Sequence, residues 1–300
     1  MKRRTSLTIM LLIIIPFFAG ALQAAPREGG QQKAIDKARA SSAEAKSFRS
    51  FIEGKKAESK KDTGSSNYYA SPLKAAKLSY QESLTLPVKG SYACKDETQL
   101  RVLAGMHGFD VNYALVFGRK KEFVNAMKFL NSEIAGRLKA SDLINPNLSA
   151  AEDIKALLAD LKDPQNIEKF KASWSKQFEA NLKKANADPK IMQQMLDQGY
   201  GAIIESSFVL CNLALNSADA DKLYSLFIDY MLRVDALDIK MQEFYNSDYG
   251  KALEQSDRKN FLPPIRDLIA KKHGLLDRKD IKFILTSVNK VRAEYVKPCR

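Results

Sequence analysis

Residues 188–216 read DPKIMQQMLDQGYGAIIESSFVLCNLALN, and the fold class can be worked out from this stretch. Asp188 followed by Pro189 is a typical helix start, because an acceptor side chain precedes a residue whose missing N–H has no partner in the first turn. Apolar residues then recur at every third or fourth position, which places them on one helix face. The stretch therefore predicts a helix over 189–216 with a buried face formed by Leu196, Tyr200, Ile204, Phe208, Cys211 and Leu215.

The same helical period runs from Asp96 towards the C-terminus, and strand-like alternation is nearly absent. Ser149 and Glu152 form a capping box, Pro263-Pro264 predicts a helix start, and residues 271–274 (KKHG) predict a helix end. The expected fold is one all-α domain of about eight helices, arranged as a bundle or an orthogonal array. The expected helices cover residues 96–117, 121–139, 149–162, 164–186, 189–216, 219–247, 261–273 and 277–295.

Composition excludes several classes of protein. The chain has 300 residues, of which 45% are hydrophobic and 28% charged, as in ordinary globular proteins, so disorder of the whole chain is excluded. Three Cys and two His residues exclude most metal-bound and disulfide-rich scaffolds. The sequence contains no P-loop, zinc-protease, haem-attachment or nucleophile-elbow motif. We therefore expect neither a cofactor nor a metal, and we interpret His107 and His273 as structural residues.

The first segment, residues 1–24, has the pattern of a secretory signal peptide. Lys2-Arg3-Arg4 precedes an apolar run at 7–18, and small residues lead to a cleavage site after Ala24. The apolar stretch is shorter than the roughly 20 residues that a transmembrane helix needs, which favours cleavage over an uncleaved membrane anchor, the alternative. The pattern predicts export to the periplasm or cell envelope of a bacterium.

Residues 25–90 are predicted to form a disordered basic linker. The chain carries a net charge of +13, and residues 26–90 contribute +6 of it with few large apolar side chains. The densest basic spots are expected to contact an anionic surface such as phospholipid head groups or cell-wall polymer, although a solvated spacer is the alternative. Export argues against nucleic acid as the partner. The four lysines of these spots are Lys55, Lys56, Lys60 and Lys61.

The three cysteines lie in two kinds of environment. Cys94 and Cys299 are in polar sequence just before the first and just after the last predicted helix, at the two ends of the domain predicted for residues 91–300. Cys211 lies on an apolar helix face. Because export permits disulfides, we predict a bridge between Cys94 and Cys299 and a buried thiol at Cys211. The absence of a C-x-x-C motif argues against redox catalysis.

Two glycines, Gly105 and Gly108, interrupt the predicted helix at 96–117. Each glycine costs a helix up to about 1 kcal/mol relative to alanine. We therefore expect an interaction at these positions that requires glycine and offsets this cost. We favour a close approach of two helices over the approach of a ligand to the backbone.

One short stretch points to an enzyme. Residues 203–208 (IIESSF) resemble the catalytic E-S-x-F segment of lytic transglycosylases, which are exported helical enzymes, and residues 244–250 resemble their Y-N-A-G segment. The resemblance implies that Glu205 is the general acid that protonates the glycosidic oxygen. The G-L-M-Q segment of the family is absent after Phe208. Glu205 also lies on a polar helical stripe, which predicts a solvated carboxylate rather than the apolar wall that a catalytic acid needs.

The leading hypothesis from the sequence is an exported cell-envelope protein. It would act as a non-enzymatic interaction or scaffold module on a flexible basic segment, with an envelope protein or an anionic envelope surface as its partner. A peptidoglycan-cleaving enzyme that uses Glu205 is one alternative, and a periplasmic carrier of a small apolar ligand is another.

Overall fold

A computed structural model describes residues 78–134, 137–138, 187–217, 241–242, 244, 256–272 and 276–299. These residues form helices and contain no strand, which confirms the all-α class. The signal segment, most of the predicted linker and the predicted helices at 149–162 and 164–186 lie outside them. The elements are η1 (Glu82–Leu84), α5 (Glu97–Val116), α6 (Lys120–Phe129), the π-helical turn η2 (Leu130–Ile134), α9 (Pro189–Asn216), α12 (Ser256–Lys271) and α13 (Arg278–Val296).

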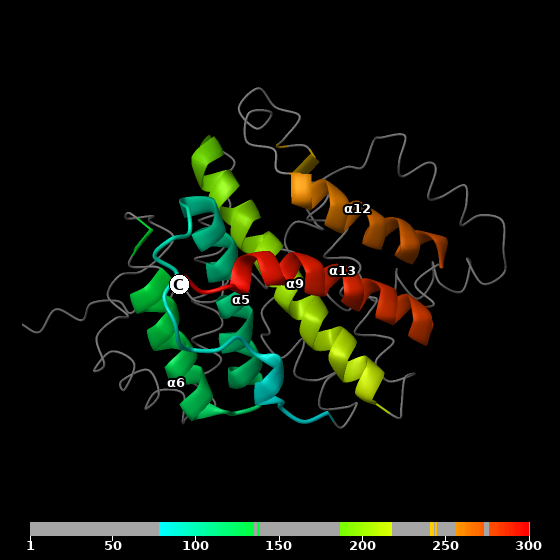
Figure 1. Ribbon diagram of the computed structural model, residues 1–300, viewed down its shortest axis with the longest axis horizontal. Helices are drawn as coiled ribbons and strands as arrows, with labels where there is room; N and C mark the ends of the chain where they lie inside the picture. Colours follow the sequence, from blue (N-terminus) through cyan, green and yellow to red (C-terminus); the bar gives the residue numbers. More distant parts are fainter. Residues whose placement is uncertain are drawn as a thin grey trace, which may run out of the picture.

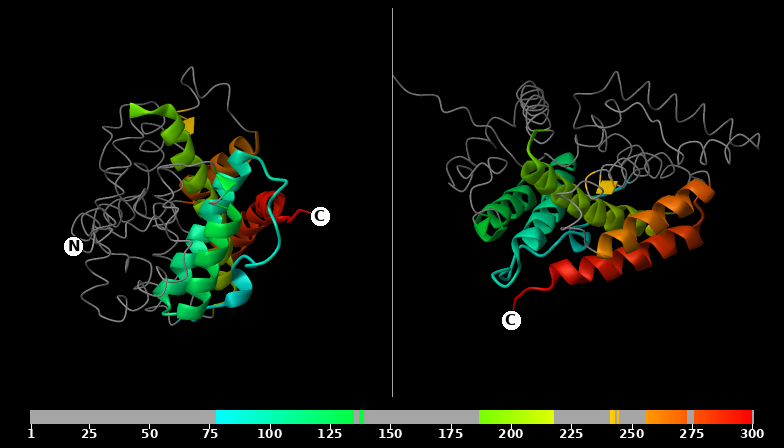
Figure 2. Two further views of the ribbon diagram at one scale, coloured as in Figure 1. Left: turned by 90° about the vertical axis from the view of Figure 1, so that its left-hand side faces the viewer. Right: turned by 90° about the horizontal axis from the view of Figure 1, so that it is seen from above.

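Helix α9 is the centre of the described fold. It crosses α5 along one side and α13 along another, as Figure 1 shows. Helix α6 packs beside α5, and α12 packs beside α13, so that two helix pairs lie against the central helix (Figure 2). The largest fully buried side chains come from most of these elements: Tyr92, Tyr200, Phe123, Phe261, Leu103, Met106, Met127 and Ile134.

Helix α9 starts at the Asp188-Pro189 cap, as the sequence predicts. The Asp188 carboxylate accepts a hydrogen bond from the Lys190 N–H at 2.8 Å, and Pro189 occupies the first turn. This N-cap satisfies one of the backbone donors that a helix start leaves unpaired. The helix ends at Asn216, so both of its bounds agree with the prediction.

The crossing of α5 and α9 depends on two glycines. A Cβ built on Gly105 would lie 2.0 Å from the Gln198 carbonyl oxygen, and a Cβ on Gly201 would lie 1.9 Å from the Val102 carbonyl oxygen. Real Cβ atoms do not approach backbone atoms so closely, so the two helices touch backbone to backbone at this point. The expectation that Gly105 permits a close helix contact is thereby confirmed.

Two predicted helix bounds are wrong. The helix expected at 121–139 is α6 followed by the π-helical turn η2, which ends at Ile134. The helix expected to start at Pro263-Pro264 starts at Ser256 and carries both prolines inside. The two residues before the prolines, Phe261 and Leu262, are 1% exposed, so their burial in the core offsets the backbone hydrogen bonds that the prolines remove.

The packed part of the chain begins before residue 91, where the sequence predicts the start of the domain. Leu84 and Leu86 are buried, and the Leu86 N–H donates to Asp110 Oδ2 at 2.8 Å. The Gln81 N–H donates to the Tyr113 hydroxyl at 3.1 Å. This end of the predicted linker therefore lies against α5 as part of the folded unit.

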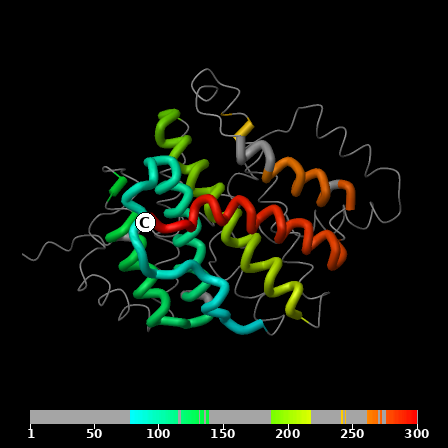
Figure 3. Tube along the Cα trace, in the orientation of Figure 1, coloured from blue at the N-terminus to red at the C-terminus, as the bar shows by residue number. Residues whose placement is uncertain are grey.

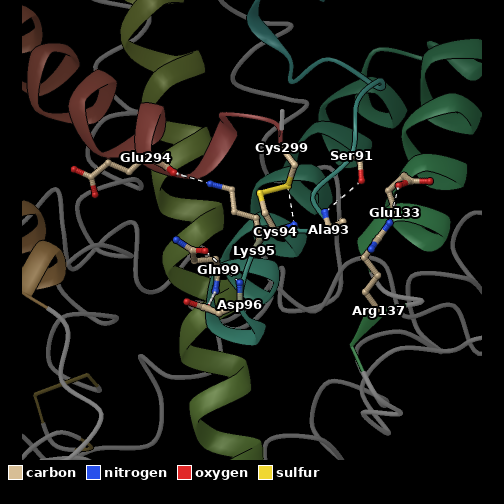
Figure 4. Close-up of a disulfide and its surroundings, with 10 residues drawn as sticks. All are labelled: Ser91, Ala93, Cys94, Lys95, Asp96, Gln99, Glu133, Arg137, Glu294 and Cys299. Atoms are coloured by element: carbon tan, nitrogen blue, oxygen red, sulfur yellow. Dashed lines mark hydrogen bonds and ion pairs between the residues drawn. A yellow bond between two sulfur atoms is a disulfide. The ribbon is translucent and has the colours of Figure 1, made fainter.

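The structure joins Cys94 to Cys299, which is the pairing predicted from the sequence. The Cys299 N–H donates to the Ser91 carbonyl at 2.9 Å, and Lys95 Nζ donates to the Glu294 carbonyl at 3.0 Å. Figures 3 and 4 show how the C-terminal end of α13 is held beside the segment that leads into α5. Cys211 is a buried thiol, as predicted, and burial raises its pKa to about 12, which keeps it unreactive.

Removal of the disulfide should destabilise the fold. The two cysteines are 205 positions apart, so the bridge restricts a long loop in the unfolded chain. We expect the double substitution Cys94→Ser and Cys299→Ser to lower the free energy of unfolding by about 2–4 kcal/mol, measured by urea denaturation. The Cys211→Ala protein should remain sensitive to reductant, whereas the double variant should not. If reductant still lowers the stability of the double variant, the assignment of the disulfide to Cys94 and Cys299 is wrong.

Candidate functional site

Three helices bring polar side chains together inside the core. Glu205 of α9 is fully buried, and both of its oxygens accept hydrogen bonds from Arg292 of α13, Nε to Oε2 at 2.8 Å and Nη2 to Oε1 at 2.8 Å. The Arg292 guanidinium also lies over the Phe208 ring, 4.1 Å from its centroid. A bidentate pair of this kind is the geometry that an ionised carboxylate adopts with arginine. We call His107, Asp110, Glu205 and Arg292 the buried ionic cluster.

The expectation that Glu205 is solvated is wrong. Its side chain is 0% exposed, and Gln198 on the same polar stripe is also buried. The polar stripe of α9 is in part an interface with neighbouring helices, because α13 packs against α9 and supplies the cation for Glu205. Burial raises the pKa of Glu205 above its ordinary range, and the hydrogen bonds and charge of Arg292 act against that shift.

Asp110 of α5 is the second buried carboxyl of the cluster. Its Oδ2 atom accepts the Leu86 N–H, whereas Oδ1 is buried with no hydrogen-bond partner in the described structure. Burial and the negative charge of Glu205 raise the pKa of Asp110 well above its ordinary range, against the opposing effects of the Leu86 N–H and Arg292. Burial therefore favours the protonated acid at Asp110, because the guanidinium of Arg292 is already bonded to Glu205 and Asp110 accepts only the Leu86 N–H.

His107 of α5 completes the cluster as a neutral imidazole. It is fully buried beside the rings of Tyr92 and Phe129, whose centroids lie 6.2 and 5.1 Å from its own. Neither ring nitrogen has a hydrogen-bond partner in the described structure. Burial, assisted by the positive charge of Arg292, lowers the pKa of His107 from 6.5 to about 3. The sequence interpretation of His107 as a structural residue agrees with this position.

His107 should make the fold sensitive to acid. The unfolded chain binds a proton at this residue near pH 6.5, whereas the folded chain binds it only near pH 3. The contribution of neutral His107 to the free energy of unfolding is therefore complete above pH 6.5 and is lost as the pH falls. The loss should be about 1.4 kcal/mol for each pH unit below 6.5. Asp110 and Glu205 act in the opposite direction, because their pKa values are raised in the folded state.

The test is urea denaturation at pH 7.0, 5.5 and 4.5 of the wild type and of His107→Leu. We expect the variant to lose much less stability between pH 7.0 and 4.5 than the wild type does. An equal loss in both proteins would show that His107 does not carry the acid sensitivity.

A second buried ion pair links α5 to α9 on the other side of the glycine contact. Arg101 Nε lies 2.7 Å from Asp197 Oδ2, and the Asp197 side chain is 0% exposed. Arg101 and Asp197 each lie four positions before the glycine of their own helix, and Glu205 lies four positions after Gly201. The Arg101–Asp197 pair thus holds α5 to α9 on one side of the glycine contact, and the Glu205–Arg292 pair holds α9 to α13 on the other.

This arrangement does not suit the cleavage of a glycosidic bond. A general acid must reach the leaving oxygen of the substrate, yet Glu205 is fully buried and both of its oxygens are held by Arg292. Asp110 is also buried, 3% exposed, and is not open to solvent as the partner carboxylate of a glycosidase has to be. The chemistry that fits the cluster is the positioning of α5, α9 and α13 by charge.

The remaining predicted site residues are placed as follows. Lys55, Lys56, Lys60 and Lys61 lie outside the described residues, as does His273. Within the described ranges, no three His, Cys, Asp or Glu side chains are arranged to bind a metal ion. In the same ranges, no helix has both the length and the apolar character of a membrane span.

Sequence reasoning missed Asp110 and Arg292. Asp110 had a detectable signal, because it is the one carboxylate between Leu100 and Phe117, in a helix that is otherwise almost entirely buried. Arg292 had none, since it is one of many cations in the C-terminal helix. Comparison of the chain with protein-family models, curated proteins and solved structures finds no match.

Proposed function

We propose that this chain is an exported cell-envelope protein that acts as a non-enzymatic interaction module, with its helical domain carried on a flexible basic segment. The observation that carries the proposal is the state of Glu205. The one residue for which the sequence suggested a catalytic role is buried and bound by Arg292, so it contributes to the packing of the helices.

Two further features support this function. The Cys94–Cys299 bridge suits a protein that folds outside the reducing cytosol, as the signal-like segment 1–24 also implies. The buried ion pairs and the glycine contact give a helical unit with a defined register, which is what a protein that presents a surface to a partner needs. The basic segment would give that surface its reach.

A cell-wall assay tests the non-enzymatic part of the proposal. Purified peptidoglycan is incubated with the wild type, with Glu205→Gln and with Glu294→Gln, the last being an exposed carboxylate on α13 that serves as the matched control. We expect no clearing of turbidity by any of the three proteins. Clearing by the wild type and by Glu294→Gln, but not by Glu205→Gln, would overturn the proposal in favour of a transglycosylase-like enzyme.

Fractionation tests the export. We expect the protein outside the cytosol, with Ala25 as its first residue by mass spectrometry and with Cys94 and Cys299 protected from alkylation until reductant is added. Recovery from the cytosol with an intact N-terminus and alkylated cysteines would contradict it.

A further inference from the structure

The outward side of α13 is a basic surface with one exposed aromatic ring. Its inward side is buried against the core, whereas Phe283 on the outward side is 49% exposed. Helix α13 lies at the edge of the described fold, with its long side outermost in the view from above (Figure 2). Positions 279, 282, 283, 286 and 290 recur at the three- and four-residue spacing of one helix face, and their side chains are exposed.

Lysines supply the charge of this surface. Four lysines are exposed on this side: Lys279, Lys282 and Lys290 on the helix, and Lys297 just after it. None of the four forms an ion pair with a described residue. We call these four lysines and Phe283 the α13 basic face. The positive charge of the α13 basic face therefore remains available to a partner.

Among the described residues, the carboxylates of α13 and of its N-cap do little to cancel this charge. Asp280 is buried and caps the helix start with Asp277, and both accept Lys272 as their cation. Glu294 is the one exposed carboxylate within α13, and it lies a full turn beyond Lys290. The middle of the face, from Lys279 to Lys290, extends over about 16 Å with no carboxylate exposed on it.

The use of lysine rather than arginine indicates the kind of partner. Two arginines make directed contacts with fully buried carboxylates, Arg101 with Asp197 and Arg292 with Glu205, whereas the α13 basic face carries lysines. Arginine suits planar, bidentate recognition, whereas lysine is a flexible point charge on an aliphatic stem. A row of lysines around one exposed phenylalanine fits a diffuse anionic surface with an apolar layer beneath it.

We infer that the α13 basic face docks on the anionic phospholipid surface of a membrane. The lysines lie over the phosphate groups, and the Phe283 ring enters the head-group region. The inference rests on the proposed function only in requiring that the protein meets a membrane surface. It assigns a contact to the folded domain, separate from the one expected for Lys55, Lys56, Lys60 and Lys61.

Vesicle co-sedimentation tests the inference with the chain as it is recovered from the producing cells. Vesicles of phosphatidylcholine alone are compared with vesicles of phosphatidylcholine and phosphatidylglycerol at three to one. We expect the triple variant Lys279→Gln/Lys282→Gln/Lys290→Gln to bind the anionic vesicles about 10- to 100-fold more weakly than the wild type. The matched control removes three exposed lysines of α6, Lys120, Lys121 and Lys128, and should bind like the wild type.

A fourth variant, Phe283→Ser, separates the two parts of the contact. It should weaken binding at every salt concentration while leaving the salt dependence unchanged, because the lysines are still present. Equal loss in the α6 control, or no loss in the α13 triple variant, would overturn the inference. Tighter retention on immobilised polyglutamate than on vesicles, with no effect of Phe283→Ser, would assign the face to an acidic protein and overturn it as well.

The outcome is distinguishable from a failure of the proposed function. A variant with glutamine at positions 55, 56, 60 and 61 reports the contribution of the N-terminal segment to vesicle binding. If that variant alone loses binding, the α13 inference fails and the tethered module stands. If the wild type clears peptidoglycan, the proposed function fails whatever the vesicles show.

Discussion

Substitution of Gly105 or Gly201 by alanine should prevent the native packing of α5 on α9. Each added Cβ would lie about 2 Å from a backbone carbonyl oxygen of the other helix, and a backbone atom cannot move aside as the end of a side chain can. The two helices would have to separate, which would disturb the Arg101–Asp197 ion pair that links them. We expect a loss of more than about 4 kcal/mol in the free energy of unfolding, or no folded protein, by circular dichroism and urea denaturation.

Gly118 provides the matched control for these substitutions. It lies in the turn between α5 and α6 with φ at +67°, and a Cβ there would meet no atom within 4 Å. Asparagine tolerates this backbone region, so Gly118→Asn should cost less than about 1 kcal/mol. The packing argument fails if Gly105→Ala and Gly201→Ala are as stable as Gly118→Asn.

The second large effect is expected for Arg292→Met. The substitution keeps an apolar stem of similar reach but removes the cation, so it leaves the carboxylate of Glu205 buried without its partner. Breaking a buried pair from one side costs about 3–5 kcal/mol, which should appear as a lower urea midpoint at pH 7. The cost should fall as the pH is lowered, because protonation neutralises the stranded carboxylate.

A double variant distinguishes a stranded charge from lost packing. Glu205→Gln combined with Arg292→Met removes both charges and should recover much of the stability that Arg292→Met loses. The exposed pair of Arg119 with Glu122 gives the control, since Arg119→Met should cost no more than about 1 kcal/mol. Strictly additive effects of the two cluster substitutions would show that Glu205 and Arg292 are not coupled.

The glycine contact and the Glu205–Arg292 pair hold α9 to two different helices. The first allows the backbones of α5 and α9 to touch, and the second ties α9 to α13 about one helical turn further along. The Cys94–Cys299 bridge then holds the far end of α13 to the segment before α5. These three constraints link α5 to α9, α9 to α13 and α13 back to the segment before α5. A single change at any of them should therefore lower the stability of the whole described unit.

The sequence by itself determined the features that depend on neighbours along the chain. The cap at Asp188 and the apolar period predict α9 with both of its bounds, because helix formation is decided by residues within a few positions. The cysteine pairing was also accessible, because two cysteines lie in polar sequence at the ends of the helical region and one lies on an apolar face.

Only the tertiary structure decided what covers each helix face. The period of α9 shows that Glu205 lies on a polar stripe, but its partner Arg292 is 87 positions away and belongs to another helix. The start of α12 shifted for the same reason, since burial of Phe261 and Leu262 outweighs the local signal of the prolines. Solvation, ionisation and burial are properties of a packed environment, and residues distant in sequence create that environment.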